Sequence, residues 1–259
     1  MTVRAAAYKI RFGAGIVSLG NEVYLADESV REELQAARTR AHAANDRAAL
    51  RRIIDLESHL MRTAALRPSM IADTKRLLEH LQVSHAVIGG LAVGVHAHPR
   101  ATDDIDLLVD GAQVEAQSHR LRDPAFMKTF NFHPLAGRRG QHWLLSHQHG
   151  SIELLGAGAT AHKDLRALAL KHAAPHGADL CGLPVVAAEH LVGLKLAAWE
   201  SDPKRMAKDR GDIISVLGAQ GDSLPDGALG YLNPKLQARL RGVTALNPAL
   251  IERLLGSAP

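Results

Sequence analysis

Two aspartates on one face of a predicted strand constrain this chain of 259 residues more than any other feature of its sequence. Residues 104–109 read Asp-Ile-Asp-Leu-Leu-Val, an apolar run typical of a buried strand. Side chains alternate along a strand, so Asp104 and Asp106 share one face, while Ile105 and Leu107 point to the other. Adjacent carboxylates repel each other and strands disfavour aspartate, so the pair requires a compensating cation. Magnesium, which prefers oxygen ligands and retains waters and substrate phosphates, is the ion that we expect.

A pair of glycines precedes this strand. Gly89 and Gly90 follow a short apolar strand predicted over residues 85–88 and open a helix predicted over residues 91–98. Glycine lets a ligand approach the backbone, and a helix N-terminus offers N–H groups that suit a phosphate. A glycine pair alone is most often only a turn, but its position before the two aspartates favours a phosphate site.

The rest of the pattern predicts an α+β fold with a sheet in the middle of the chain. Further strands are expected over residues 142–146 and 151–155, with a glycine turn between them. A helix is expected to begin at Ser69 as its N-cap, and two more are expected over residues 188–200 and 203–217.

We therefore divide the chain into three regions. Residues 1–67 form a mostly helical N-terminal extension, residues 68–160 form the core, and residues 161–259 form a helical region that completes the active site. The extension is expected to begin with a small hairpin, whose strands fall around Tyr8–Phe12 and Val23–Leu25.

The helical part of the extension is basic. Residues 36–67 contain seven arginines and three acids, an excess of +4 that equals the formal net charge of the whole chain. Such a run is either a solvated helix face or a surface for a polyanion. We expect Pro68 to end this segment.

Composition excludes several classes of protein. Aromatic residues make up only 3% of the chain, which argues against binding of single strands by base stacking. Cys181 is the single cysteine, so no internal disulfide can form and a reducing cytoplasm is expected. No apolar run approaches the roughly 18 residues of a membrane span, so no membrane partner is expected.

The region from the glycine pair to the aspartates resembles the signature of the polymerase-beta-type nucleotidyltransferase superfamily, since thirteen residues separate Gly90 from Asp104. Residues 100–106, Arg-Ala-Thr-Asp-Asp-Ile-Asp, are also similar to a form found in its AbiEii-like branch of abortive-infection and toxin–antitoxin proteins. The resemblance covers roughly residues 69–217. It implies a mixed sheet flanked by helices.

The resemblance also implies roles for individual residues. Asp104 and Asp106 would hold two magnesium ions, while the backbone around the glycine pair, together with Arg100 and Thr102, would bind the nucleoside triphosphate. A third carboxylate is expected on a neighbouring strand, where Glu153 is the match. The family more often has aspartate there, so Glu153 is either a catalytic metal ligand with altered geometry or an edge-strand residue facing water.

Two later segments resemble motifs of the same branch, in which a helix lysine is followed by a Lys-Asp-x-x-Asp helix. Lys195 would reach the triphosphate from the first helix. Asp209 and Asp212 share one face of the second helix, where they would orient Lys195 or a substrate hydroxyl. The alternative is an ordinary solvated helix rich in lysine and arginine.

Histidines could suggest a different metal site, because His142, His147 and His149 lie close together in the sequence. No cysteine or carboxylate completes a tetrahedral set at suitable spacing, so we interpret them as turn and surface residues.

The resemblance implies a metal-dependent nucleotidyltransferase that moves a nucleoside monophosphate to an acceptor hydroxyl. Three functions stay open. The acceptor is RNA, such as a tRNA end, in an enzyme that an antitoxin protein would control; or it is a small molecule, as in antibiotic-modifying enzymes; or the chain is a binding protein that keeps the fold without turnover. The pair Asp104 and Asp106 argues against the third function, whereas the glutamate at position 153 keeps it open.

Overall fold

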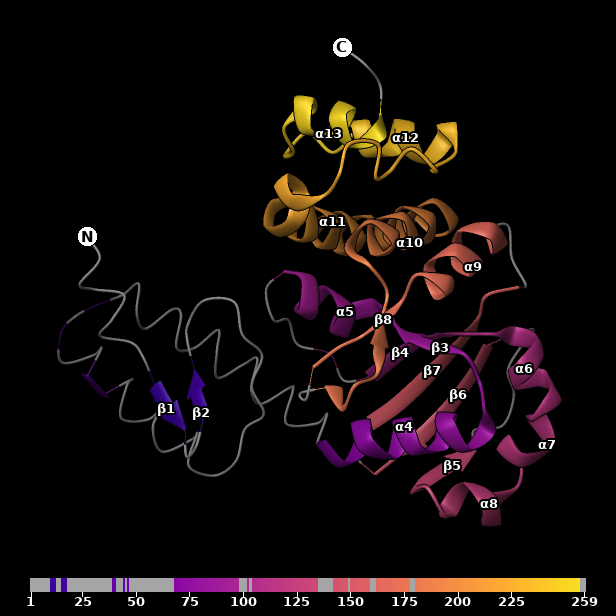
Figure 1. The fold of residues 1–259 in the computed structure, drawn as a ribbon. Coiled ribbons are helices and arrows are strands. Elements are labelled where there is room, and N and C mark those ends of the chain that lie inside the picture. Colours follow the sequence, from indigo (N-terminus) through magenta and orange to yellow (C-terminus); the bar gives the residue numbers. More distant parts are fainter. Residues whose placement is uncertain are drawn as a thin grey trace.

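The computed structural model describes residues 10–12, 15–17, 39–40, 44, 46, 68–97, 102, 104–134, 142–148, 150–158, 162–177 and 180–256. Within these residues, no helix is both long and apolar enough to cross a bilayer. The predicted α+β class is confirmed, since a mixed seven-stranded sheet lies among helices (Figure 1).

The sheet is built around a central strand that carries the two aspartates. Its strand order is β5-β6-β7-β4-β3-β9-β8. Strand β4 pairs in parallel with β7 and antiparallel with β3. The bounds are β3 His85–Val87, β4 Asp104–Val109, β5 Phe132–Pro134, β6 His142–His147, β7 Gly150–Gly156, β8 Ala174–Pro175 and β9 Pro184–Val185.

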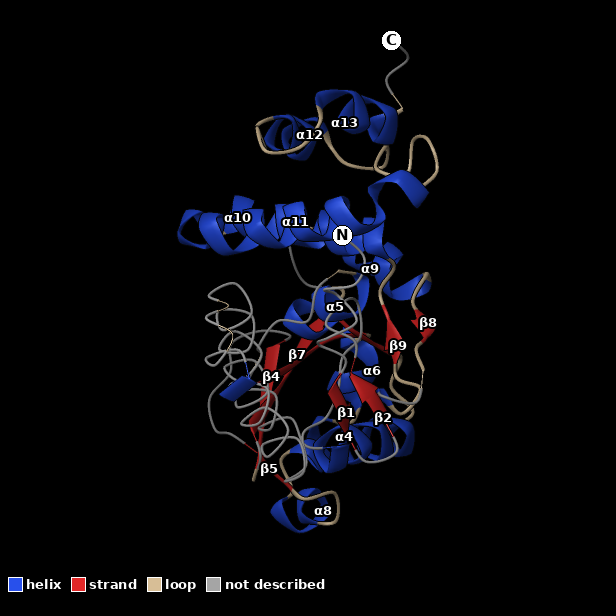
Figure 2. Ribbon diagram, turned by 90° about the vertical axis from the view of Figure 1, so that its left-hand side faces the viewer, coloured by secondary structure: helices blue, strands red, loops and turns tan. Residues whose placement is uncertain are grey.

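Helices cover both faces of this sheet and continue into a C-terminal helical layer. From residue 68 onward, the helices described before β5 are α4 Pro68–Leu81, α5 Gly89–His96, α6 Gly111–Ala116, α7 Ser118–Leu121 and α8 Pro124–Lys128. Those after β7 are α9 Lys163–Lys171, α10 Ala188–Ser201, α11 Met206–Gln220, α12 Pro234–Arg241 and α13 Pro248–Leu255, with short 3-10 turns η2 Pro203–Arg205 and η3 Gly221–Ser223. Figures 1 and 2 show α12 and α13 stacked on α10 and α11, away from the sheet.

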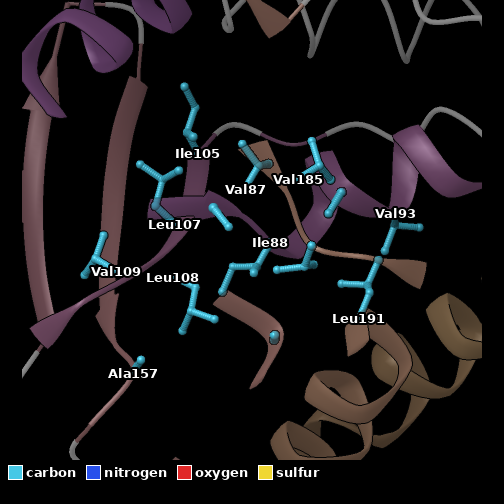
Figure 3. Packing of buried hydrophobic residues seen from close by; sticks show 14 of the residues in the cluster. Val87, Ile88, Val93, Ile105, Leu107, Leu108, Val109, Ala157, Val185 and Leu191 are labelled. Atoms are coloured by element: carbon cyan, nitrogen blue, oxygen red, sulfur yellow. The ribbon is translucent and has the colours of Figure 1, made fainter. Parts of the chain in front are cut away.

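One face of the two strands β4 and β7 is apolar. Ile105 and Leu107 of β4 and their register partners Ile152 and Leu154 of β7 are almost completely buried. Figure 3 shows Ile105 and Leu107 beside Val87 of the neighbouring strand. Burying these side chains leaves the other face of β4 to carry Asp104 and Asp106, as the alternation predicts.

Helix α4 is held against the apolar face by a buried polar contact. The Asp73 carboxylate lies 3.3 Å from Nε2 of His147 and accepts a hydrogen bond of 2.7 Å from Asn131. His147 is buried and follows Leu145, the partner of Ile152, at the same side of β6. The prediction that His147 is a surface residue is therefore wrong. His147 is buried, and its contact with Asp73 supports the packing of α4 on the sheet. His149 lies outside the described residues.

Several predicted boundaries differ from the structure. Helix α4 begins at Pro68, so Ser69 lies in the first turn rather than at the N-cap. Proline suits a first turn because its missing N–H has no helical partner to lose. Helix α5 already begins at Gly89, and the predicted helix from Pro203 is a 3-10 turn followed by α11.

The N-terminal hairpin is a two-stranded antiparallel sheet of β1 Ile10–Phe12 and β2 Gly15–Val17. Its second strand begins at Gly15, earlier in the chain than predicted, because Phe12 is already paired with Gly15. The expected strand around Val23–Leu25 and most of the basic segment lie outside the described residues.

Candidate active site

The register of β4 and β7 brings two acidic side chains side by side. Asp106 is paired with Glu153, and Asp104 with Ser151. Paired residues of neighbouring strands point to the same face of a sheet. Asp106 and Glu153 accordingly line one cavity of about 390 Å³, which helix α10 also lines through Leu191, Leu194 and Lys195.

Gly89 lies directly against the Asp106 carboxylate. Its φ is +66°, a left-handed conformation that favours glycine, and a Cβ at this position would lie 1.8 Å from Oδ2 of Asp106. Gly89 and Gly90 also form the first turn of α5, where Ile88 at the N-cap provides no side-chain hydrogen bond. A side chain at position 89 would collide with this carboxylate. Ile88 also leaves the first N–H groups of the helix without an N-cap hydrogen bond.

The environment of Asp106 opposes its ionisation. Burial, followed by the charges of Asp104 and Glu153, raises the pKa of the Asp106 carboxyl to about 6, although Lys195 and Lys208 act in the opposite direction. A carboxyl in such surroundings gains strongly from a cation that offsets the neighbouring negative charge.

Thr102 orients the carboxylate of Asp104. Thr102 is buried, and its hydroxyl donates a hydrogen bond of 2.7 Å to Oδ1 of Asp104 and lies 3.1 Å from the Asp104 carbonyl oxygen. The contact that the structure shows for Thr102 is therefore with Asp104, and its predicted role in nucleotide binding stays a prediction. Arg100, the other residue of this motif, lies outside the described residues.

Lys195, Asp209 and Asp212 form a buried group between α10 and α11. The Lys195 ammonium lies 2.6 Å from Oδ2 of Asp212 and 3.4 Å from Oδ1 of Asp209. Arg205 donates from Nε to the other oxygen of Asp209 at 2.9 Å. Asp209 and Asp212 are buried rather than solvated, so the alternative of an ordinary exposed helix face is excluded.

The cavity is also lined by polar residues that were not predicted from the sequence as site residues, among them Arg205, His142 and Arg166. His142, at the start of β6, places Nε2 3.2 Å from the Glu153 carboxylate. Arg166 of α9 lines the same cavity. No sequence signal marks Arg166, because it belongs to no motif and approaches the cavity only through the packing of α9 against α10 and β4.

Asp104 and Asp106 suit a hard cation such as magnesium, although the protein side chains alone do not form a complete metal site. Among the described residues, no three or more His, Cys, Asp or Glu side chains are arranged to hold a metal ion together. Magnesium needs only one or two carboxylates, because waters and substrate phosphates complete its shell. Asp104 and Asp106, together with the close approach of Gly89, fit that requirement.

Comparisons with known proteins identify no family for the chain. No family model matches the sequence. No curated protein matches it either.

Solved structures with a similar arrangement exist, at low identity. The solution structure of the antibiotic-resistance factor ANT(2'')-Ia is 14% identical, with a TM-score of 0.45 over 68% of this chain and 93% of that chain. An antigenic nucleotidyltransferase-like protein from Paracoccidioides brasiliensis is 18% identical, with a TM-score of 0.45 over 72% and 89%. The lincosamide antibiotic adenylyltransferase LnuA, bound to lincomycin, is 14% identical, with a TM-score of 0.39 over 58% and 96%. Similarity at this level carries no information on the activity of this chain.

Proposed function

We propose that this chain is a metal-dependent nucleotidyltransferase of the polymerase-beta type, which moves a nucleoside monophosphate from a nucleoside triphosphate to an acceptor hydroxyl. The observation that carries the proposal is the pair Asp104 and Asp106 on one face of β4, with the backbone of Gly89 pressed against Asp106 inside a cavity. The motif resemblance of residues 89–106 supports the same activity.

Asp104 and Asp106 would hold magnesium, and Glu153, which is paired with Asp106 in the sheet, would help to activate the acceptor hydroxyl. When bound, magnesium neutralises charge on the phosphates and polarises the phosphorus that is attacked. Thr102 keeps the Asp104 carboxylate in one orientation, which reduces the reorganisation needed on binding.

The other residues of the cavity would bind and orient the substrates. The N–H groups at Gly89 and Gly90 suit phosphate oxygens at the start of α5. Lys195, oriented by Asp209 and Asp212, places a positive charge at the cavity wall. In the reaction, the acceptor oxygen bonds to the α-phosphorus, the bond to the bridging oxygen breaks, and pyrophosphate leaves with the electron pair. The hydroxyl proton passes to Glu153 and then to solvent.

RNA is the acceptor that we propose. Exposed basic residues of the η2–α11 segment lie at the cavity, since Arg205 lines it and the charge of Lys208 acts on Asp106. A polyanion such as RNA is attracted to exposed basic residues at the edge of a binding cavity. The toxin-like form of this proposal adds an antitoxin protein as partner, which co-purification of the chain with the product of a neighbouring gene would test.

Incubation with labelled nucleoside triphosphates, magnesium and either total RNA or a panel of small hydroxyl compounds tests the activity and its acceptor together. Wild-type protein is expected to label RNA, Asp106→Asn is expected not to, and Glu115→Gln, an exposed carboxylate on α6, serves as the matched control. Label on small molecules alone would establish the antibiotic-type alternative. Absence of label on every acceptor would favour the non-catalytic binding protein.

A further inference from the structure

The cavity is lined by three cationic side chains, and they differ in how their charge is balanced. Lys195 is paired with two aspartates, and Arg205 with Asp209. Arg166 has no carboxylate within ion-pair distance in the part of the chain that the structure describes. Of the three, Arg166 is the cation that no carboxylate of the described residues balances.

The described residues satisfy little of the hydrogen-bonding capacity of Arg166. Its Nη1 donates to the Gly156 carbonyl oxygen at 3.5 Å, the long limit of a hydrogen bond, whereas a guanidinium has five N–H donors. The side chain is half-buried, and this burial lowers the pKa of Arg166 with no carboxylate acting against it. Holding a charge partly away from water is costly unless an anion compensates for it.

Arg166 reaches the cavity from a different side than the glycine pair. Strands β3 and β7 flank β4 on opposite sides. Gly89 follows β3, whereas Gly156, the contact of Arg166, ends β7 three residues after Glu153. An anion at Arg166 would therefore occupy a position separate from one bound by the N–H groups of Gly89 and Gly90.

We propose that Arg166 binds a phosphate group of the substrate on the β7 side of the cavity. A planar guanidinium matches two phosphate oxygens at once, which makes phosphate the anion that best satisfies its donors. The inference rests on the proposed function and deepens it, since the phosphate comes either from the nucleoside triphosphate or from the backbone of the acceptor. It also predicts that an acceptor portion bound at this position is anionic rather than cationic.

Calorimetric titration of the full chain in magnesium distinguishes these sources. The probes are inorganic pyrophosphate, ATP, adenosine and a short RNA oligonucleotide. For Arg166→Gln, we expect affinity for the phosphate-bearing probe that uses this position to fall about ten- to a hundredfold, as for a lost charge-assisted contact, with adenosine unaffected. The affinity of Arg166→Lys for this probe should lie between those of wild type and Arg166→Gln, because an ammonium keeps the charge but not the bidentate geometry. Lys163→Gln, an exposed cation on the same helix outside this cavity, is the matched control.

The pattern of losses identifies the source of the phosphate. A loss confined to pyrophosphate and ATP assigns the nucleotide, and a loss confined to RNA assigns the acceptor backbone. Equal affinity of wild-type and Arg166→Gln for all probes would overturn the inference while leaving the proposed function intact. If wild-type protein binds neither ATP nor pyrophosphate, both the inference and the proposed function are wrong.

Thermal unfolding without ligand separates binding from a structural role. Arg166→Gln is expected to unfold at or above the wild-type temperature, because the substitution removes a desolvated charge that lacks a carboxylate partner. If Arg166→Gln instead unfolds well below wild type and Lys163→Gln does not, Arg166 is a structural residue and the inference fails.

Discussion

Replacing Lys195 by methionine tests the buried group between α10 and α11 most directly. Methionine keeps most of the aliphatic volume of the lysine stem but removes the ammonium that lies 2.6 Å from Asp212 and 3.4 Å from Asp209. Both aspartates are buried, so the substitution leaves negative charge in the interior with less compensation.

The expected loss of stability follows from this geometry. Removing one partner of a buried ion pair typically costs 3–5 kcal/mol. Asp209 keeps its 2.9 Å contact with Arg205, so we expect the lower part of this range, about 3 kcal/mol. For a chain of this size, that corresponds to a fall in Tm of roughly 6 to 12 °C.

Urea unfolding and thermal unfolding of ligand-free protein at pH 7 measure this loss. Lys171→Met, an exposed lysine on α9, is the control and should unfold like wild type. The double variant Lys195→Met/Asp212→Asn should recover much of the loss, because the amide removes the charge that methionine left uncompensated. If Lys195→Met unfolds within about 0.5 kcal/mol of wild type, the pairing is weak and the reasoning from burial is wrong.

Further predictions concern activity and pH. Lys195→Ala, assayed at a temperature where it is folded, should lose nucleotide transfer by a factor of order ten to a thousand, and unchanged kinetics would exclude a role for Lys195 at the phosphates. Asp104→Asn or Asp106→Asn should abolish transfer while the fold is kept or slightly stabilised without metal, and comparable turnover in saturating magnesium would contradict this. Because the pKa of Asp106 is raised in the folded state to about 6, the unfolded chain binds fewer protons between the two values, so stability should fall as pH rises from about 4 to about 6 in the presence of chelator. Asp106→Asn should lack this part of the pH dependence in matched denaturation curves. If RNA is the acceptor and the basic segment of residues 36–67 contacts it, the double variant Arg51→Ala/Arg52→Ala should weaken RNA binding and make its salt dependence shallower, since each phosphate contacted contributes roughly 0.7 to 0.9 to the log-log slope.

The sequence alone determined the central strand and the position of the two aspartates on it. The predicted strand, residues 104–109, has the bounds of β4 in the structure. Its apolar residues Ile105 and Leu107 direct one face toward the core, and alternation then places the carboxylates on the opposite face. The strand–glycine–helix–strand order around Gly89 was predictable for the same reason, because glycine and the change of periodicity are local signals.

Only the tertiary structure decided the edges of the sheet. Strands β8 and β9 are two residues long and each contains a proline, so neither has a periodicity that a sequence pattern can reveal. They become strands because β9 pairs with Val87 of β3 and β8 then pairs with β9. Pairing partners that are distant in the chain supply the hydrogen bonds that local propensity does not predict.

The surroundings of the candidate site were also decided by packing. Periodicity placed Asp209 and Asp212 on one helix face, but whether that face met water or Lys195 depended on how α11 lies against α10. Arg166 stands 60 positions after Asp106 and in no motif, yet it lines the same cavity. Local rules determine which way a side chain points from its own element, whereas the charges and cavity walls that it meets depend on contacts between elements far apart in the sequence.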